Sequence, residues 1–435
     1  MNRKFWLIGM CMTISVLQSC SADKGEGKAP GETAAEKPKE PFTMTIYAAG
    51  VKAEEFDDRF RGALQKKFPH ITFEYRTNGK GQEIADLVTA GTIPDVIRTD
   101  VPNLRNNYID LDLAEDLNPY VKKYQYDLNR FNKVFIDEIV DAGRTGALYG
   151  LPVPPYFPHV LYYNKDLFNR FGVPYPKDGM SFDEIYELAK KMSRADGNNV
   201  YRGFSAAANS VLRDNLFSLP ILDPLADQLA NPDRWKAIFS NYKRFYDIPN
   251  NPIESTTANE TNAFAKGNVA MQVNLHSVYL IIPQEIDWDI VSHPTMEGAP
   301  KLTAQRGPAY WSIAKTSKHK DEAFQVITAM LTDEIQMEDS KKGIPATVVN
   351  KEIKDALGKG HPLYSTKNMR AISYYDPIPY TPKRKASLPD IPGSKQQALL
   401  FQAFLDFAQN KADANTALRK LDEQLKAEVE KEKAK

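Results

Sequence analysis

Helical and extended patterns of hydrophobic residues alternate along the first part of the chain. Four large apolar side chains recur every four residues, the spacing of one helix face: Phe56, Phe60, Leu64 and Phe68. Short β-prone runs stand on either side, at 44–48 and 71–75, and a second helix at 83–90 leads to a third strand at 95–98. Strands that alternate with helices predict crossover connections and a mainly parallel α/β sheet.

The residues just beyond these strands are the first candidates for a ligand site, because open α/β sheets bind ligands at the carboxyl ends of their strands. They lie at 48–51 and 99–103, and the second stretch contains Asp100 and Asn103. An aspartate there can accept hydrogen bonds from ligand hydroxyls, but Asp and Asn are also ordinary turn residues. Both interpretations stay open at this point.

A proline-rich segment separates two β-prone runs in the middle of the chain. Its prolines fix φ and donate no backbone hydrogen bond, so they hold the segment extended: Pro152, Pro154, Pro155 and Pro158. We expect a hinge here, followed by a strand at 160–163 and a short helix at 165–171. Ser181 and Glu184 form a capping-box pattern, which predicts a helix over 182–192.

The first twenty residues have the layout of a secretory signal peptide. Arg3 and Lys4 precede an uncharged, mostly apolar run at 5–17, shorter than the ~20 residues that span a bilayer. Leu17-Gln-Ser-Cys20 resembles the lipobox of bacterial lipoproteins, whose cysteine is lipidated and becomes the new N-terminus. The resemblance predicts a signal peptide at 1–19 and lipidation of Cys20. The alternatives are a plain signal peptide with an accidental cysteine, or an uncleaved apolar anchor.

The segment behind the anchor has the composition of a flexible tether. Residues 21–41 contain no aromatic residue and no Leu, Ile or Val, so they cannot bury enough apolar surface to offset their ordering entropy. A random coil of this length reaches roughly 25 Å. The lipidated cysteine and the tether together are expected to occupy residues 20–41.

Size and charge narrow the possible classes for the rest of the chain. Roughly 390 residues follow position 42, more than one hydrophobic core usually serves, so two lobes are expected. The whole chain is formally neutral, and loss of Arg3 and Lys4 with the signal leaves a charge of −2. Nothing favours a nucleic-acid partner, which would require a basic face. Cys20 would be the only cysteine of the mature chain, because Cys11 lies in the signal. We expect the mature protein to be a monomer.

Six motifs follow one another along the body of the chain. They are Gly91-Thr-Ile-Pro-Asp-Val-Ile97, Tyr149-Gly-Leu-Pro152, Leu161-Tyr-Tyr-Asn-Lys-Asp-Leu-Phe168, Phe264-Ala-Lys-Gly-Asn-Val-Ala-Met271, Trp311-Ser-Ile-Ala-Lys-Thr-Ser-Lys318 and Ala414-Asn-Thr-Ala-Leu-Arg-Lys-Leu421. In this order and spacing they resemble the family 1 extracellular solute-binding proteins, the receptor components of bacterial ABC importers. The most specific motif is the third, which follows the proline-rich segment.

The resemblance implies an α/β, two-lobed, periplasmic-binding-protein-like fold of type II, with mainly parallel sheets flanked by helices and the solute held in the cleft between the lobes. The first lobe would comprise residues 42–151 plus 307–342, and the second 152–306 plus 343–435. The segments that cross between them are expected near 152–158, 303–310 and 343–347.

The resemblance also places candidate ligand contacts on these crossings. Tyr156 and Phe157 lie on the first crossing, and Tyr310 and Trp311 on the second. An aromatic ring can pack against the C–H face of a sugar, and the alternative for all four is packing within the hinge. His276 is a further candidate contact, although a lone histidine in such a connection is more often structural. Sugar-binding relatives often carry Gly and Trp near this point, and their absence weakens the case for a maltose-like oligosaccharide.

The sequence gives no sign of catalysis. No two of the six histidines have metal-ligand spacing, and neither a phosphate-binding glycine loop nor a G-x-S-x-G motif occurs. We therefore expect no catalytic residue, metal or cofactor. The expected function is that of a lipid-anchored receptor on the extracytoplasmic face of the cell membrane, which captures a small solute, an oligosaccharide, and delivers it to an ABC permease. The alternatives are a ligand-sensing lipoprotein with a signalling partner and a glycoside hydrolase, which would need two carboxylates facing one cleft.

Overall fold

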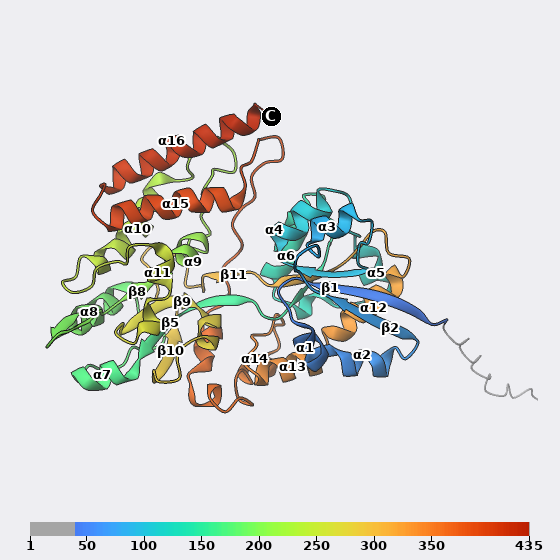
Figure 1. Ribbon diagram of the computed structural model, residues 1–435, viewed down its shortest axis with the longest axis horizontal. Helices are drawn as coiled ribbons and strands as arrows, with labels where there is room; N and C mark the ends of the chain where they lie inside the picture. The colour runs from blue at the N-terminus through green and yellow to red at the C-terminus, as the bar shows by residue number, and fades with distance from the viewer. Residues whose placement is uncertain (1–39, 435) are drawn as a thin grey trace, which may run out of the picture. The chain divides into compact units, whose positions relative to one another are not determined.

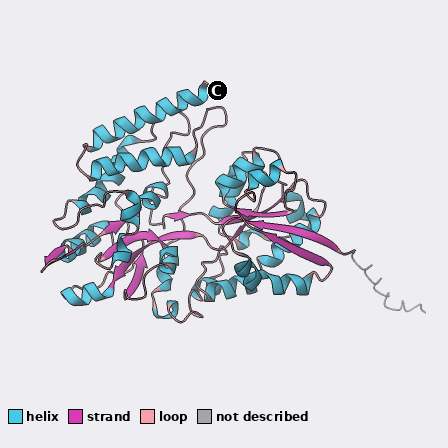
Figure 2. Ribbon diagram, in the orientation of Figure 1, coloured by secondary structure: helices cyan, strands magenta, loops and turns pink. Residues whose placement is uncertain are grey.

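Two larger sheets, each flanked by helices, organise residues 40–434, which the computed structural model describes (Figures 1 and 2). The predicted signal peptide, Cys20 and nearly all of the predicted tether lie outside the described residues. Within the described range, no helix has the length and apolarity that crossing a membrane requires.

The first sheet has the strand order β2-β1-β3-β12-β4. Strand β1 pairs in parallel with β2 and β3, whereas β12 pairs antiparallel with β3 and β4. The predicted parallel pairing is thus confirmed for the first three strands, but the sheet as a whole is mixed. The reason lies in the connections, because β4 leads the chain out of this lobe and β12 brings it back in the opposite direction.

The predicted elements of this lobe are confirmed. The helix predicted by the four regularly spaced apolar side chains is a continuous helical stretch with a π-helical middle, and all four side chains are buried. The elements are β1 (Phe42–Ala48), α1 (Ala53–Phe56), η1 (Asp57–Arg61), α2 (Gly62–Lys67), β2 (Ile71–Arg76), α3 (Ile84–Thr89), β3 (Val96–Thr99), α4 (Val101–Leu104), η2 (Arg105–Ile109), α5 (Asn118–Lys123), η3 (Leu128–Arg130), α6 (Lys133–Ala142), β4 (Leu151–Val153), β12 (Ala309–Ile313), α12 (Lys320–Met330), α13 (Asp333–Lys341) and α14 (Lys351–Asp355).

The second sheet has the order β10-β5-β9-β8, and β11 also pairs with β5. It is mostly antiparallel, unlike the predicted mainly parallel sheets; β8 with β9 is its parallel pair. The predicted helix at 165–171 and the capping box of Ser181 are confirmed. The elements are β5 (Phe157–Asn164), α7 (Lys165–Phe171), α8 (Phe182–Met192), β6 (Arg194–Asp196), β7 (Asn199–Tyr201), β8 (Ser205–Ala206), α9 (Ala208–Arg213), α10 (Pro232–Tyr246), α11 (Thr257–Thr261), η4 (Ala263–Lys266), β9 (Met271–Leu275), η5 (His276–Leu280), β10 (Trp288–Ser292), β11 (Gln305–Arg306), η6 (Tyr364–Thr366), η7 (Met369–Ser373), α15 (Gly393–Ala408) and α16 (Ala414–Lys433).

The two large sheets have separate hydrophobic cores. One gathers side chains around the first sheet, and the other two surround the second sheet, where α15 and α16 lie side by side against α10 (Figure 1). Ala346, Val348 and Ile353 belong to the first core. The chain therefore keeps its contacts with the first lobe beyond residue 342, after which the second lobe was predicted to resume.

Two crossings between the lobes run side by side. Strands β4 and β5 are joined through residues 154–156, and β11 and β12 through 307–308; β11 pairs with β5, and β12 pairs with β4. Arg59 fixes the first crossing to the first lobe, because its guanidinium donates to the Pro154 carbonyl at 3.2 Å and forms a buried two-point ion pair with Asp339. The hinge-like segment thus starts from a rigid support.

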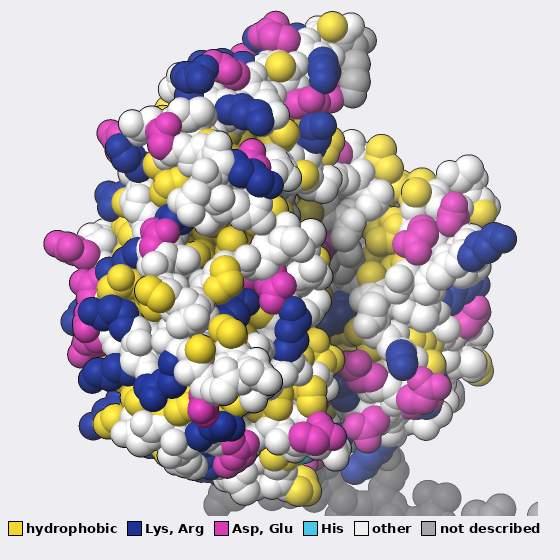
Figure 3. Space-filling view, turned by 60° about the vertical axis from the view of Figure 1, so that its left-hand side comes forward, with side chains coloured by type: hydrophobic (Ala, Val, Ile, Leu, Met, Phe, Trp, Pro, Cys, Tyr) yellow, Lys and Arg dark blue, Asp and Glu magenta, His cyan; other side chains and the backbone are white. Residues whose placement is uncertain are grey.

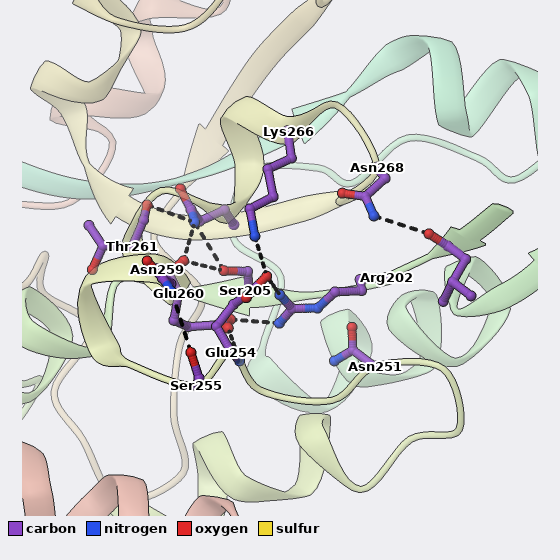
Figure 4. A network of polar contacts seen from close by, with 12 residues as sticks. Arg202, Ser205, Asn251, Glu254, Ser255, Asn259, Glu260, Thr261, Lys266 and Asn268 are labelled. Carbon is purple, nitrogen blue, oxygen red and sulfur yellow. Dashed lines mark hydrogen bonds and ion pairs between the residues drawn. The ribbon is translucent and has the colours of Figure 1, made fainter.

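A buried polar network holds β8 and α11 together in the second lobe. Figure 4 shows Arg202 reaching Glu260, whose carboxylate oxygen lies 2.7 Å from the guanidinium. The other carboxylate oxygen of Glu260 accepts the backbone N–H of Glu254 at 2.9 Å. Ser205 donates to the Glu260 carbonyl, and the Gln272 amide donates to Ser205. The network satisfies groups that would otherwise be costly to bury.

Candidate functional site

A polar cavity of about 350 Å³ lies between the two lobes. Figure 3 shows the surface hollowed between them. Four parts of the chain line the cavity: Asp100 to Pro102 and Glu138 from the first lobe, Arg213 to Asn215 and Ser218 from the second, residues 305–308 on a crossing, and 378–381 with Lys383 and Gln397 from the C-terminal part. It is the place where side chains of both lobes could contact one solute.

Asp100 lies in this cavity, in agreement with its predicted position at the carboxyl end of β3. It caps α4, since one carboxylate oxygen accepts the backbone N–H of Asn103 at 3.2 Å and the Asn103 amide at 2.7 Å. The other oxygen pairs with Arg306 at 2.9 Å. Asn103 itself is exposed and does not line the cavity, so its contact with the site is indirect.

Glu138 is the second carboxylate that the first lobe offers. Its carboxylate lies 2.9 Å from the hydroxyl of Tyr310, which is also 2.8 Å from the Phe135 carbonyl. Burial raises the pKa of the Glu138 carboxyl, and the charge of Lys383 acts in the opposite direction. A side chain at Gly307 would collide with this carboxylate, because its Cβ would lie 2.4 Å away. The crossing therefore packs directly against Glu138.

The second lobe contributes an arginine and an aspartate that are locked together. Arg213 ends α9, and its guanidinium donates to Asp214 at two points, 2.7 and 2.5 Å. Nε2 of His159 lies 3.6 Å from the same carboxylate. Burial acts to raise the pKa of Asp214, but the hydrogen bonds from Arg213 and the nearby His159 outweigh it, and the pKa is lowered. Asp214 thus stays ionised at neutral pH.

Trp311 and Tyr310 are fully buried side chains of the first lobe. Strand β12 lies between β3 and β4, and every residue from Ala309 to Ile313 is buried. The Trp311 ring packs edge-on to Phe60 with 6.3 Å between centroids, and its indole N–H has no acceptor among the described residues. The structure therefore places Trp311 in the core and not on the cavity wall. Tyr310 acts on the site only through Glu138.

The other predicted aromatic contacts lie near the first crossing but outside the cavity. Tyr156 is buried and packs against Phe135 at 5.2 Å. Phe157 is partly buried and stacks on His276, with 5.5 Å between their rings. His276 is 2% exposed, and burial lowers its pKa to about 3, so it is neutral. None of these three side chains lines the cavity.

Sequence reasoning missed most of the charged residues that line the cavity. Arg306 could have been found, since it is a charged side chain on a predicted crossing. Glu138 sits on an amphipathic helix, and Arg213 and Asp214 end a short one, so their local patterns are those of ordinary surface residues. Lys383 follows a proline-rich stretch that has no helical or strand pattern.

The lining suits a ligand with many hydroxyl groups. The carboxylates of Asp100, Glu138 and Asp214 can accept hydrogen bonds, and the guanidinium groups of Arg213 and Arg306 can donate them. In the part of the chain that the structure describes, no group of three or more potential ligating side chains could hold a metal ion. The arrangement offers binding groups held in place by their own hydrogen bonds.

Comparison with known proteins defines the class. Residues 45–337 match the model of the bacterial extracellular solute-binding proteins, which is more than half of the chain. The chain belongs to this family, as the six motifs predicted. The family is one of solute-binding proteins and not of enzymes.

Individual relatives are distant. A binding protein of Brucella abortus is 25% identical over 213 residues, which are 48% of this chain and 46% of the relative. An ABC transporter extracellular-binding protein of Pyrococcus horikoshii is 23% identical over 202 residues, 44% of each chain. The matches span about half the length of these curated relatives. A sugar transporter structure from Rhizobium etli, in an open conformation, has a TM-score of 0.68 at 19% identity and covers 88% of this chain and 99% of that one. This likeness confirms the two-lobed α/β fold.

Proposed function

We propose that this protein is the receptor of an ABC importer, which captures an oligosaccharide between its lobes and delivers it to a permease. The observation that carries the proposal is the cavity whose polar lining comes from both lobes and from a crossing. The carboxylates and guanidinium groups match the acceptors and donors of a hydroxyl-rich solute. The names of the Rhizobium and Pyrococcus proteins, a sugar transporter and an ABC transporter component, support the same function.

Closure of the two lobes about the crossings would couple solute binding to a change in the conformation of the protein. A solute that contacts Glu138 on one lobe and Arg213 on the other interacts with both only when the lobes approach each other. Such a solute shifts the population toward the closed form by its differential affinity for that form. The paired crossings, one of them tied to Arg59, are the segments about which the lobes would move.

A ligand screen tests the capture of a saccharide. Residues 40–435 should melt at a higher temperature with a matching oligosaccharide, because a ligand at a hundredfold excess over its Kd adds about 2.7 kcal/mol to the free energy of unfolding. Glu138→Gln should weaken binding roughly tenfold, since the amide replaces one oxygen acceptor by a donor. Asp137→Asn on the same helix is the matched control, because Asp137 pairs with Lys133 and lies outside the cavity. Stabilisation by peptides and by no saccharide would refute the sugar assignment.

Anchoring through Cys20 is a separate part of the proposal. A receptor that must meet a permease repeatedly benefits from a tether, and two or more acyl chains hold a protein stably at a membrane. The Cys20→Ser variant should leave the membrane fraction of expressing cells and keep its affinity for solute. Retention of this variant in the membrane fraction would mean that the apolar run at 5–17 is itself the anchor.

A further inference from the structure

A second cavity of about 240 Å³ adjoins the first and has a markedly basic lining. The two share Arg213, Thr381, Lys383 and Gln397, so they are neighbouring compartments with a common wall. The second compartment adds Arg105 from the first lobe and Arg384 from the C-terminal part, and its one acidic lining residue is Asp390. Four basic side chains thus face one acidic side chain.

The hydrogen-bond and ion-pair partners of these basic side chains show which of them could bind an anionic group of a ligand. Arg384 is buried and occupied, since its guanidinium donates to the Pro389, Asp223 and Ala226 carbonyls and pairs with Asp227. Arg105 pairs with Asp110 at a long 3.5 Å. Lys383 has no ion pair within the described residues and is only partly exposed. Its Nζ lies 5.7 Å from the centre of the Tyr380 ring.

No carboxylate of the first compartment forms an ion pair with this lysine, although its charge opposes the rise that burial causes in the pKa of Glu138. Asp100 is paired with Arg306, and Asp214 with Arg213. Glu138 is held by the Tyr310 hydroxyl, and burial raises its pKa. The site therefore has a first compartment of fixed acceptors and donors for hydroxyl groups, and a second with excess positive charge. Lys383 and Arg213 stand where the two meet.

We infer that the solute is an acidic oligosaccharide, whose hydroxyls occupy the first compartment and whose carboxylate, sulfate or phosphate group binds at Lys383 in the second. This inference rests on the proposed function and names the substrate class of the same site. An anionic oxygen beside an ammonium group in a partly enclosed cavity forms a charge-assisted hydrogen bond, which is stronger than one between neutral groups. The low aromatic content of the lining agrees with this, because Tyr380 is the one aromatic side chain in either compartment.

The experiment compares matched acidic and neutral ligands on the chain over residues 40–435. Calorimetric titration would use a galacturonic acid trisaccharide, its methyl ester, a sulfated trisaccharide and a neutral trisaccharide of galactose. The acid should bind about tenfold to a hundredfold more tightly than its ester, and its affinity should fall as salt is added. Preference for the sulfated ligand over the carboxylate would identify the source of the anionic group.

Two variants test whether Lys383 causes the difference in affinity between the acid and its ester. Lys383→Gln should bring the affinities for acid and ester close together, whereas Lys385→Gln should preserve their ratio, because Lys385 is exposed on the same segment and lines neither compartment. Equal melting temperatures of the two variants would show that both fold. Binding of neutral ligands as tight as, or tighter than, that of acidic ones would overturn the inference and leave the proposed function standing. If no saccharide of any kind binds, the proposed function itself fails.

Discussion

Replacing Trp311 by alanine is expected to lower the free energy of unfolding by about 3–5 kcal/mol. The indole is fully buried on a central strand, against Phe60, and its removal leaves a cavity that the flanking strands cannot fill by moving. The indole N–H has no acceptor among the described residues, so the substitution breaks no hydrogen bond of the indole and the lost stability comes from packing. Urea unfolding of both proteins measures the difference.

The same variant separates packing from ligand contact. Because Trp311 does not line the cavity, its folded alanine variant should keep the affinity of the original chain for any saccharide found in the screen. Tyr374→Ala is the control for an aromatic truncation, since Tyr374 is 50% exposed and should change stability by no more than about 0.5 kcal/mol. Loss of binding with little change in stability would place Trp311 in contact with the solute.

Glu260→Ala is expected to cost about 3–5 kcal/mol as well, for an electrostatic reason. The substitution leaves the guanidinium of Arg202, whose side chain is 7% exposed, buried without its partner at 2.7 Å. It also removes the acceptor of the Glu254 backbone N–H. Both groups would lose hydrogen bonds in a region that water does not reach easily.

Two further variants show whether charge is the cause. Glu254→Ala should be much milder, because Glu254 is more exposed and its contact with Arg202 is 3.5 Å long. Replacing Arg202 by Met and Glu260 by Leu together should recover much of the lost stability, since an apolar pair leaves no buried charge without a partner. Equal losses for Glu260→Ala and the double variant would mean that shape, and not the unpaired charge, is the cause.

Much of the first lobe could be predicted because its elements carry local signals. The four-residue spacing of Phe56, Phe60, Leu64 and Phe68 requires one buried helix face, and the structure buries all four. Ser181 and Glu184 form the capping box that their spacing predicts. Such features depend on residues close in sequence, so sequence alone is enough to find them.

The wall of the cavity could be predicted only in part, because it joins residues that are far apart in the chain. The place of Asp100 in the cavity wall could be predicted, since its position after a strand is a topological signal, whereas its contact with a solute stays a prediction. Trp311 was expected to face the solute because it is aromatic and lies on a crossing. A strand such as β12, buried on both faces, shows no alternation that would tell which side chain faces the cleft. Arg306 and Asp100 pair across 206 residues of sequence, so no local pattern indicates this contact.

The structure of the complex with a saccharide from the screen tests solute capture between the lobes most directly. We predict that the saccharide lies in the shared cavity, within hydrogen-bond distance of Asp100 or Glu138 on the first lobe and of Arg213 or Asp214 on the second. A saccharide that contacts the side chains of one lobe alone, or that binds outside this cavity, would contradict capture by closure of the two lobes.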